Sequence, residues 1–316
     1  MHTARIFADT KNMSREEWLE ARRKGIGGSD ASAIMGLNPY TSPLKVYMDK
    51  TGKAEEKETN EAMRQGTDLE AYVAERFTEE TGKKAKRCNK ILQHTDYPWM
   101  LANVDRLIVG ENAGLECKTT SPYSKFKFEE GELNPHYYWQ SMHYMAVTGY
   151  EKWYVAILVL GKAFHVFEVA RDEEAVRALV SAEKDFWCDN VLTKTPPLPT
   201  GSEADDEALN DLYPVGGDAG DYIEISGMDD MLDARAFKAK QRDELDAQIR
   251  EIDQALKMHL GEFQRGITAG WKINWTNTQS SRIDTKMLKE KYPQIAEEVT
   301  RTTAGRRFSV AKIKEE

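Results

Sequence analysis

The sequence predicts an α/β domain that is followed by a mainly helical C-terminal extension. Helical and strand-like patterns are interleaved over about the first 190 residues, and the composition changes after residue 200. The helical patterns lie at 14–24, 30–35, 43–50, 60–81, 135–148 and 172–190. The β-rich runs lie near 90–93, 101–109, 115–118, 153–160 and 163–169.

Residue types at the ends of the helical patterns indicate where helices begin and end. Ser14 is followed three residues later by Glu17, which is the arrangement of a capping box at a helix start. Gly82 and Gly149 directly follow the helical patterns at 60–81 and 135–148. Glycine is common just past a helix end because it adopts the left-handed conformation without a Cβ clash.

Two pairs of β-rich runs are joined by short glycine-containing turns and therefore predict β-hairpins. Gly161 and Lys162 separate the runs 153–160 and 163–169. The segment Gly110–Gly114 separates a second pair, and this hairpin carries the charged residues discussed below.

The net charge of −9 is concentrated in one segment. Ser202 to Asp230 holds ten acidic residues and no lysine or arginine, while the rest of the chain has 43 acidic and 44 basic residues. The overall acidity therefore does not exclude a nucleic acid as ligand. We expect a folded domain at 1–200, an acidic linker at 201–229, and a helical extension with room for short strands at 230–316.

Other bulk features favour an intracellular protein. The chain has no run of 18 apolar residues and no apolar core of a signal peptide near its start, so no membrane span is expected. The three cysteines, Cys88, Cys117 and Cys188, are widely spaced and predict neither a disulfide framework nor a zinc site.

Within the extension, apolar residues recur at coiled-coil spacing over about two and a half heptads. They are Leu245, Ile249, Ile252, Leu256 and Phe263. This pattern is compatible with a helical hairpin packed on the first domain. It is also compatible with a short coiled coil that mediates oligomerisation or partner docking.

Asp105, Glu116 and Lys118 form the most informative pattern in the chain: Asp, ten residues, Glu, one residue, Lys. Residues two apart on a strand share a face, and Asp105, expected near the middle of the partner strand, should reach the same spot. Two carboxylates and an ammonium group suit a divalent metal with a hydrolytic water, a site that can break phosphodiester bonds. The alternative is a solvated hairpin whose charges alternate with core residues.

Two expected helices carry further candidates. Glu70 borders an apolar stripe whose residues are spaced four apart, so it either reaches a metal or is an ordinary exposed glutamate. Gln140 lies on the later helix, and His143 could share its face. A lone histidine at such a position is more often a packed or surface residue than a ligand.

A basic cluster before a glycine-rich turn could bind phosphate. Arg22, Arg23 and Lys24 precede the turn Gly25–Ser29. Backbone N–H groups, a hydroxyl and a guanidinium group together can hold an anion. The turn matches neither a Walker loop nor a dinucleotide-binding fingerprint, so its own signal is weak.

Taken in order, these segments resemble the YqaJ-type viral recombinases, a family that includes phage lambda exonuclease-like enzymes of the PD-(D/E)xK nuclease superfamily. The resemblance spans residues 14–190. The matching positions are Trp18, Arg23–Ala31, Lys50–Gly52, Gly66, Glu70, Asp105, Leu115–Lys118, Gln140 and Met145–Gly149. One departure is Val104, which stands where the superfamily usually has proline before the first aspartate.

The resemblance implies a restriction-endonuclease-like fold, with a mixed central sheet flanked by helices. By the same resemblance, Asp105 and Glu116 would ligate Mg²⁺ or Mn²⁺ together with the backbone carbonyl of Cys117. Glu70 would complete a second metal position or an outer shell.

The resemblance also assigns the remaining roles. Lys118 would activate the attacking water or stabilise developing negative charge, and Gln140 would contact the reacting phosphate or water. Arg23 and Ser29 would hold a terminal 5′ phosphate or the nearby DNA backbone.

These roles lead to a metal-dependent DNA exonuclease, acting 5′→3′ on double-stranded ends in phage-type homologous recombination. The resemblance further implies a ring-like homo-oligomer, a single-strand annealing partner, and a phage or prophage protein in the cytoplasm of a bacterial host. Two alternatives remain open. One is an endonuclease or nickase of the same fold, and the other is a non-catalytic DNA-binding or assembly protein.

Overall fold

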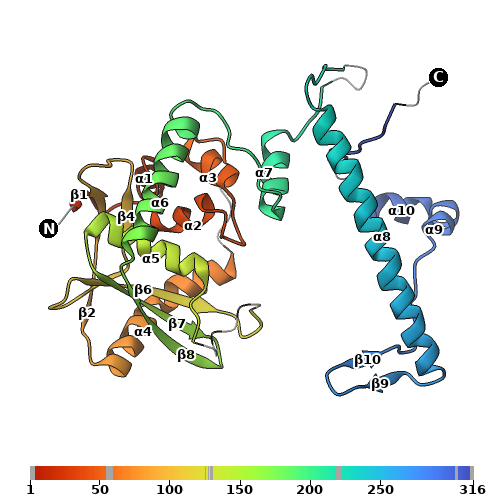
Figure 1. The fold of residues 1–316 in the computed structure, drawn as a ribbon, viewed down its shortest axis with the longest axis horizontal. Coiled ribbons are helices and arrows are strands. Elements are labelled where there is room, and N and C mark those ends of the chain that lie inside the picture. Colours follow the sequence, from red (N-terminus) through yellow and green to blue (C-terminus); the bar gives the residue numbers. More distant parts are fainter. Residues whose placement is uncertain are drawn as a thin grey trace. The chain divides into compact units, whose positions relative to one another are not determined.

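The computed structural model divides the chain into two units, Met1–Pro214 and Val215–Glu316. It describes residues 4–54, 60–124, 126, 128, 131–217, 222–302 and 305–313. Figure 1 shows the elements of both units, which are described separately here because their relative placement is not determined.

A five-stranded mixed sheet in the order β2–β5–β6–β7–β8 forms the centre of the first unit (Figure 1). Its strands are β2 (Ala85–Arg87), β5 (Arg106–Ile108), β6 (Ala113–Thr120), β7 (Lys152–Val159) and β8 (Ala163–Ala170). Strands β6 and β7 are parallel, and the other neighbours are antiparallel. A parallel pair needs a crossover, and here that connection contains α5 (Pro135–Thr148).

Helices cover both faces of this sheet. Along β7, Trp153, Val155 and Ile157 join the apolar cluster that includes α5 and α6 (Glu173–Asp185). The alternate residues, Tyr154 and Ala156, join the cluster formed with α4 (Glu61–Thr81) on the opposite face. All five are buried, as expected for a central strand covered on both sides. The expected α/β class, with a mixed sheet flanked by helices, is confirmed.

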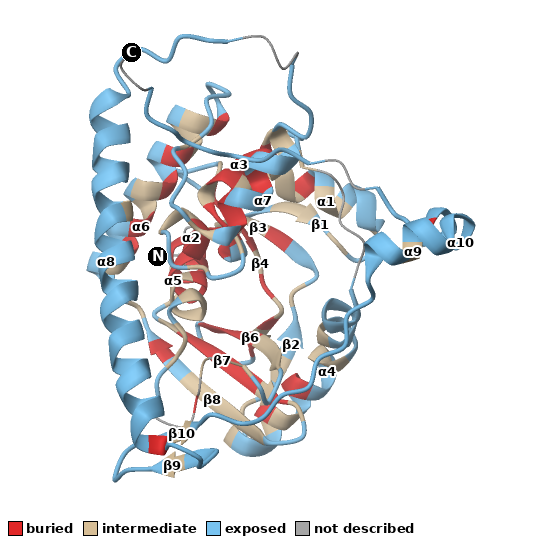
Figure 2. Ribbon diagram, turned by 90° about the vertical axis from the view of Figure 1, so that its right-hand side faces the viewer, coloured by how far each residue is buried: buried red, intermediate tan, exposed pale blue. Residues whose placement is uncertain are grey.

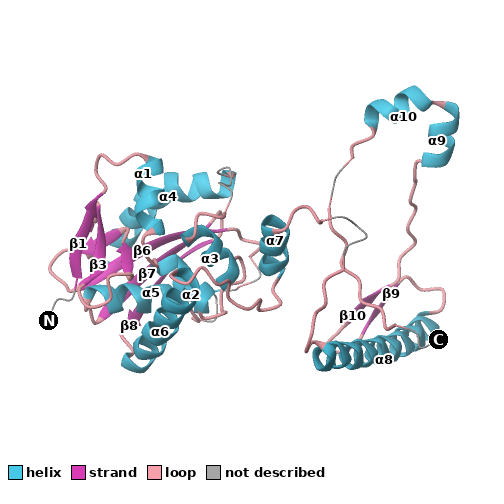
Figure 3. Ribbon diagram, turned by 90° about the horizontal axis from the view of Figure 1, so that it is seen from above, coloured by secondary structure: helices cyan, strands magenta, loops and turns pink. Residues whose placement is uncertain are grey.

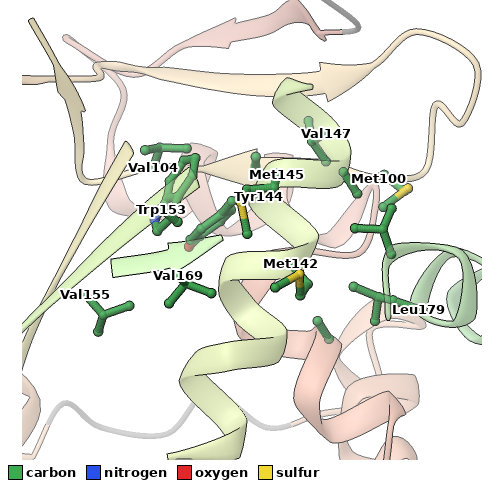
Figure 4. Packing of buried hydrophobic residues seen from close by; sticks show 14 of the residues in the cluster. Met100, Val104, Met142, Tyr144, Met145, Val147, Trp153, Val155, Val169 and Leu179 are labelled. Atoms are coloured by element: carbon green, nitrogen blue, oxygen red, sulfur yellow. The ribbon is translucent and has the colours of Figure 1, made fainter. Parts of the chain in front are cut away.

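Close packing between α5 and the sheet fixes how the helix sits on the strands. The rings of Tyr144 and Trp153 lie 5.0 Å apart between centroids and are tilted by 35°, and Figure 4 shows them next to each other close to Val104. On neighbouring β6, a Cβ added to Gly114 would lie 2.2 Å from the Trp153 ring. Only glycine leaves room there for the indole, which packs in turn against Tyr144 of α5.

A smaller three-stranded sheet has the order β1–β3–β4. Its strands are β1 (Ala4–Asp9), β3 (Lys90–His94) and β4 (Leu101–Asn103). Strand β1 was not expected from the sequence. It has no regular alternation of buried and exposed residues, so its sequence carries no period-two signal.

The N-terminal helices lie close to their expected bounds. They are α1 (Arg15–Arg23), α2 (Gly28–Ile34) and α3 (Pro43–Lys50). The capping box of Ser14 and Glu17 is present at the start of α1. The end of α6 continues into a π-helical turn, Phe186–Val191, within the expected range 172–190 save for its last residue.

The first half of the acidic segment is helical and packs on the first unit. In α7 (Glu203–Leu212), Ala208 is fully buried with residues of α3, and Lys45 forms an ion pair with Glu207. The structure therefore ends the first unit at Pro214, beyond the boundary at residue 200 that the sequence predicted. Asp218 and Asp221 lie outside the described residues.

The second unit is built around one long helix. Its elements are α8 (Asp229–Leu260), β9 (Arg265–Ile267), β10 (Lys272–Asn274), α9 (Thr285–Lys291) and α10 (Pro293–Val299), and Figure 3 shows them by type. Helix α8 is continuous rather than a helical hairpin, and Leu260 is its one buried residue. Figure 2 shows the helix exposed over most of its length. Within the described residues, no helix has both the length and the apolar composition that crossing a membrane requires.

Candidate active site

The hairpin that carries Glu116 and Lys118 is present. Strands β5 and β6 pair antiparallel, with Arg106 opposite Leu115. The Nζ atom of Lys118 lies 2.6 Å from Oε1 of Glu116, so the two side chains meet on one face of β6 as the period-two pattern predicted.

Asp105 reaches the same place by a different route from the one expected. It is not in the middle of a strand, because it lies in a bend between β4, which pairs with β3, and β5, which pairs with β6. Its Oδ2 accepts a hydrogen bond from the backbone N–H of Cys117 at 2.9 Å. The chain leaves one sheet and joins the other at this residue, and the bend turns the carboxylate onto β6.

Burial makes the charges of this group unusual. Burial, reinforced by the nearby charge of Glu116, raises the pKa of Asp105 to about 8. Burial alone would lower the pKa of Lys118, but the charges of Glu116 and Asp105 outweigh that effect and raise it, so the ammonium group stays protonated. We call Asp105, Glu116 and Lys118, with Gln140, the Asp105 cluster.

Gln140 holds this cluster in place from α5. Its Nε2 donates to Oε1 of Glu116 at 2.7 Å and to the hydroxyl of Tyr144 at 2.9 Å. The Tyr144 hydroxyl in turn donates to the backbone carbonyl of Asn103, two residues before Asp105, at 3.1 Å. The helix is thereby tied both to a cluster carboxylate and to the strand that leads into Asp105.

Glu70 lies one step away from the cluster. Its Oε1 pairs with Nη1 of Arg106 at 2.5 Å, and the same nitrogen donates to the backbone carbonyl of Asp105 at 2.9 Å. Glu70 therefore contacts Asp105 through Arg106, and it does not line the cleft described next.

A cleft of about 220 Å³ opens over the Asp105 cluster. Its lining comprises Trp18, Arg22, Gly27, Gly28, Ser29, Ile91, Leu101, Asn103, Asp105, Glu116, Lys118, Gln140 and Tyr144. The carboxylates thus share one cleft with the glycine-rich turn and with an arginine. In the sequence, more than 70 residues separate Arg22 and the glycine-rich turn from the two carboxylates.

The arginine in the cleft is Arg22, the neighbour of the expected residue. Its Nη2 donates to the Ser29 hydroxyl at 2.9 Å, and its guanidinium lies 4.6 Å from the Trp18 ring centroid. Arg23 instead pairs with Asp49 at 3.5 Å and does not line the cleft. The signal for Arg22 was its position four residues after Trp18, which puts both side chains on one face of α1.

The glycine-rich turn is held against β4 and the interior. Ile26 donates to the carbonyl of Trp99 at 2.7 Å and accepts from the N–H of Leu101 at 2.8 Å. A Cβ on Gly28 would lie 2.6 Å from the Tyr144 ring, so the close approach that positions Ser29 requires glycine. Behind the turn, buried Asp30 pairs with buried Lys50 at 2.7 Å.

A second buried charged pair joins α5 to α6, and the sequence did not predict it. Nδ1 of His143 lies 2.7 Å from Oε1 of Glu183, and its Nε2 donates to the carbonyl of Leu101 at 2.9 Å. Both side chains are fully buried, and neither lines the cleft. We call this pair the His143 cluster. It agrees with the view of His143 as a packed histidine.

The donors of the Asp105 cluster fit a hard divalent cation that keeps part of its water shell. Oε2 of Glu116 is buried without a hydrogen-bond partner among the described residues. The raised pKa of Asp105 means that its negative charge is unfavourable there without a nearby cation. Across all the residues that the structure describes, no three His, Cys, Asp or Glu side chains converge on one point. A cation would therefore rest on two carboxylates and other oxygens, as Mg²⁺ commonly does.

Comparison with known proteins identifies the family. Residues 17–151 match the YqaJ-like viral recombinase domain. The chain is also 38% identical over 314 residues to the uncharacterized protein YqaJ of Bacillus subtilis, covering 98% of each chain. The chain belongs to the YqaJ family. The family resemblance predicted from the ordered motifs is thereby confirmed.

Solved structures similar to this YqaJ-family chain are more distant. An alkaline exonuclease from Laribacter hongkongensis is 19% identical, with a TM-score of 0.48 over 57% of this chain and 94% of that one. A phage-related exonuclease from Haemophilus somnus is 12% identical, with a TM-score of 0.40 over 54% and 96%. Similarity at this level does not assign an activity.

Proposed function

We propose that this YqaJ-family protein is a metal-dependent deoxyribonuclease that degrades linear duplex DNA from its ends, 5′→3′, in phage-type recombination. The observation that carries the proposal is one cleft in which two carboxylates and Lys118 face an arginine and a serine hydroxyl. The first group suits hydrolysis of a phosphodiester, and the second suits binding of a phosphate.

The carboxylates would hold the metal. Asp105 and Glu116 would ligate Mg²⁺ or Mn²⁺, with the backbone carbonyl of Cys117 as a further oxygen ligand. Such an ion supplies a hydroxide-like water and offsets the charge of the phosphate. Glu70, which pairs with Arg106, would fix the carbonyl of Asp105 rather than bind the metal itself.

Lys118 and Gln140 would act on the reacting groups. The ammonium of Lys118 stays protonated beside Glu116, so it can orient the attacking water or stabilise the developing negative charge. Gln140 keeps Glu116 turned toward the cleft through its 2.7 Å hydrogen bond, and it lines the cleft where it can also contact the phosphate.

Arg22 and Ser29 would hold a phosphate at the far side of the cleft. We assign this role to Arg22 rather than Arg23 because Arg22 bonds to Ser29 and lines the cleft. Contacts to phosphate carry no base information, which suits an enzyme that must advance through any sequence. Binding through them is expected to weaken as salt is raised.

Degradation of end-labelled linear duplex DNA in Mg²⁺ tests the proposal, with covalently closed circular DNA in parallel. We expect loss of the linear duplex, an intact circle, and a rate lowered more than about 100-fold in Asp105→Ala, because this change removes a metal ligand. Asp68→Ala, an exposed aspartate on α4, is the matched control. No degradation by the wild type, or equal rates for wild type and Asp105→Ala, would refute the proposal. A cut circle would indicate an endonuclease instead.

The proposed reaction also implies partners. Resection of one strand leaves a single strand, which a single-strand annealing protein would take up. A homo-oligomer around the duplex would keep the enzyme on its substrate between cuts. Light scattering of the full chain tests this, and a monomer with and without DNA would count against it.

A further inference from the structure

Three aromatic side chains form a connected group beside Lys118. The ring of Tyr137 lies 5.5 Å from Nζ of Lys118, and the ring of His136 lies 3.8 Å from that of Tyr137. Tyr40 then contacts His136 edge to face, with 6.1 Å between centroids. Tyr40 comes from the loop between α2 and α3, and the other two come from the first turn of α5.

Tyr40 presents its ring to solvent although its loop is held. The residue is 74% exposed. Its backbone N–H donates to Oδ1 of Asn38 at 2.9 Å, and Nδ2 of Asn38 donates to the hydroxyl of Ser32 on α2 at 3.0 Å. An aromatic ring that is fixed at its base and free on its face is suited to stacking with a ligand.

His136 supports this ring as an uncharged aromatic. Its Nδ1 lies 2.8 Å from Oδ1 of Asn134, which also caps the start of α5. Burial, with the charge of Lys118 adding to it, lowers the pKa of His136 to about 4. At neutral pH the imidazole therefore adds no second positive charge beside Lys118, and it packs against Tyr40 through its ring.

We propose that Tyr40 stacks on an unpaired nucleobase of the strand that is cleaved, with His136 positioning the tyrosine ring. The inference rests on the proposed nuclease function and deepens it by naming the state of the substrate at the site. Every base has an aromatic face, so stacking holds a strand without reading its sequence. A base inside a duplex has no free face, so Tyr40 can stack only on a base that is unpaired or that ends the duplex.

Binding of a fluorescent single-stranded oligonucleotide to the full chain, followed by anisotropy in EDTA, tests this. A single abasic site is moved through the first four positions from the 5′ end. We expect one abasic position to weaken wild-type binding, and Tyr40→Ala to weaken binding of the intact oligonucleotide about tenfold. Tyr40→Ala should lose no further affinity at that abasic position, because the stacked pair is already absent. Tyr40→Phe should bind like the wild type.

Tyr222→Ala is the matched control, because Tyr222 is a 94% exposed tyrosine of the second unit. The proposal is overturned if Tyr40→Ala binds within twofold of the wild type, or if the abasic site weakens both proteins equally. Equal losses in Tyr40→Phe and Tyr40→Ala would also overturn it, because they would indicate a hydroxyl contact.

Two results separate this inference from the proposed function. A wild type that binds the oligonucleotide but does not cleave in Mg²⁺ would refute the nuclease function. The comparison of abasic positions would then decide the stacking by itself. Cleavage with an unaffected Tyr40→Ala would remove the stacking alone. A wild type that binds no DNA would remove both.

Discussion

The Asp105 cluster and the His143 cluster are two buried groups of charged side chains that both contact helix α5, and they differ in their ratio of carboxylates to basic groups. The His143 cluster pairs one imidazole with one carboxylate and is sealed from solvent. The Asp105 cluster sets two carboxylates against one ammonium and opens on a cleft. Each contains one carboxylate oxygen without a partner among the described residues, Oε2 of Glu116 and of Glu183. An unpaired oxygen alone therefore does not mark a site, and what distinguishes the Asp105 cluster is its second carboxyl group at an open cleft.

The largest effect is expected for Asp105→Asn, which should lower the activity of the Asp105 cluster without lowering the stability of the protein. In Asp105→Asn, we expect the nuclease rate to fall more than about 100-fold because a metal ligand is lost. We expect the free energy of unfolding without metal to stay the same or increase, because the amide is neutral without taking up a proton on folding and its oxygen can still accept from Cys117. Initial rates and urea unfolding in EDTA measure the two quantities. Strong destabilisation would contradict the comparison.

The opposite result is expected for the His143 cluster. His143→Ala leaves Glu183 buried and unpaired, so we expect a loss of about 3–5 kcal/mol in the free energy of unfolding. The rate per folded molecule should change only a few-fold. His143→Leu combined with Glu183→Leu should recover part of the stability, because no lone charge then remains in the interior. A full loss of activity in a stable His143→Ala protein would give this pair a catalytic role.

The pH dependence of stability should also differ between the wild type and Asp105→Asn. The pKa of Asp105 is raised from 3.8 to about 8 in the folded protein, so the folded state binds its proton more tightly than the unfolded state does. This stabilisation is complete below pH 4 and is lost as the pH rises toward 8. Unfolding free energies between pH 5 and 9 in EDTA should show a decline in the wild type that is absent in Asp105→Asn. The same slope in both proteins would mean that another group titrates.

The smallest expected effect lies at the phosphate side of the cleft. Arg22→Ala should weaken DNA binding about tenfold and reduce its salt dependence by about one phosphate contact, whereas Arg23→Ala should leave both nearly unchanged. The two residues are adjacent and equally charged, so each is the matched control of the other. Binding titrations at several salt concentrations make the comparison. A larger effect of Arg23→Ala would restore the role first expected from the sequence.

Local patterns predicted the parts of the site that lie on one element. Glu116 and Lys118 follow the period of a strand, and Gln140 follows from the bounds of α5, which the structure reproduces. The sequence could not place Asp105, because its position depends on two sheets that meet at one bend. It also did not separate Arg22 from Arg23, since adjacent helical residues point about 100° apart and only tertiary contacts select one of them.

The C-terminal extension also shows that a local sequence pattern does not predict tertiary contacts. The heptad-like spacing correctly indicated a helix at α8, but it did not decide between a hairpin and a single helix. That choice depends on whether another surface covers the apolar stripe. In the described second unit, Leu245, Ile249, Ile252 and Leu256 remain exposed.

Helix α5 donates from three side chains within little more than one turn, Gln140, His143 and Tyr144, to a cluster carboxylate and to the backbone of β4. Opening of this turn would break all three contacts at once. Amide hydrogen exchange in α5 should therefore report the competence of the site directly. A ligand that fills the cleft should therefore slow exchange on this turn, because Gln140 and Tyr144 line the cleft.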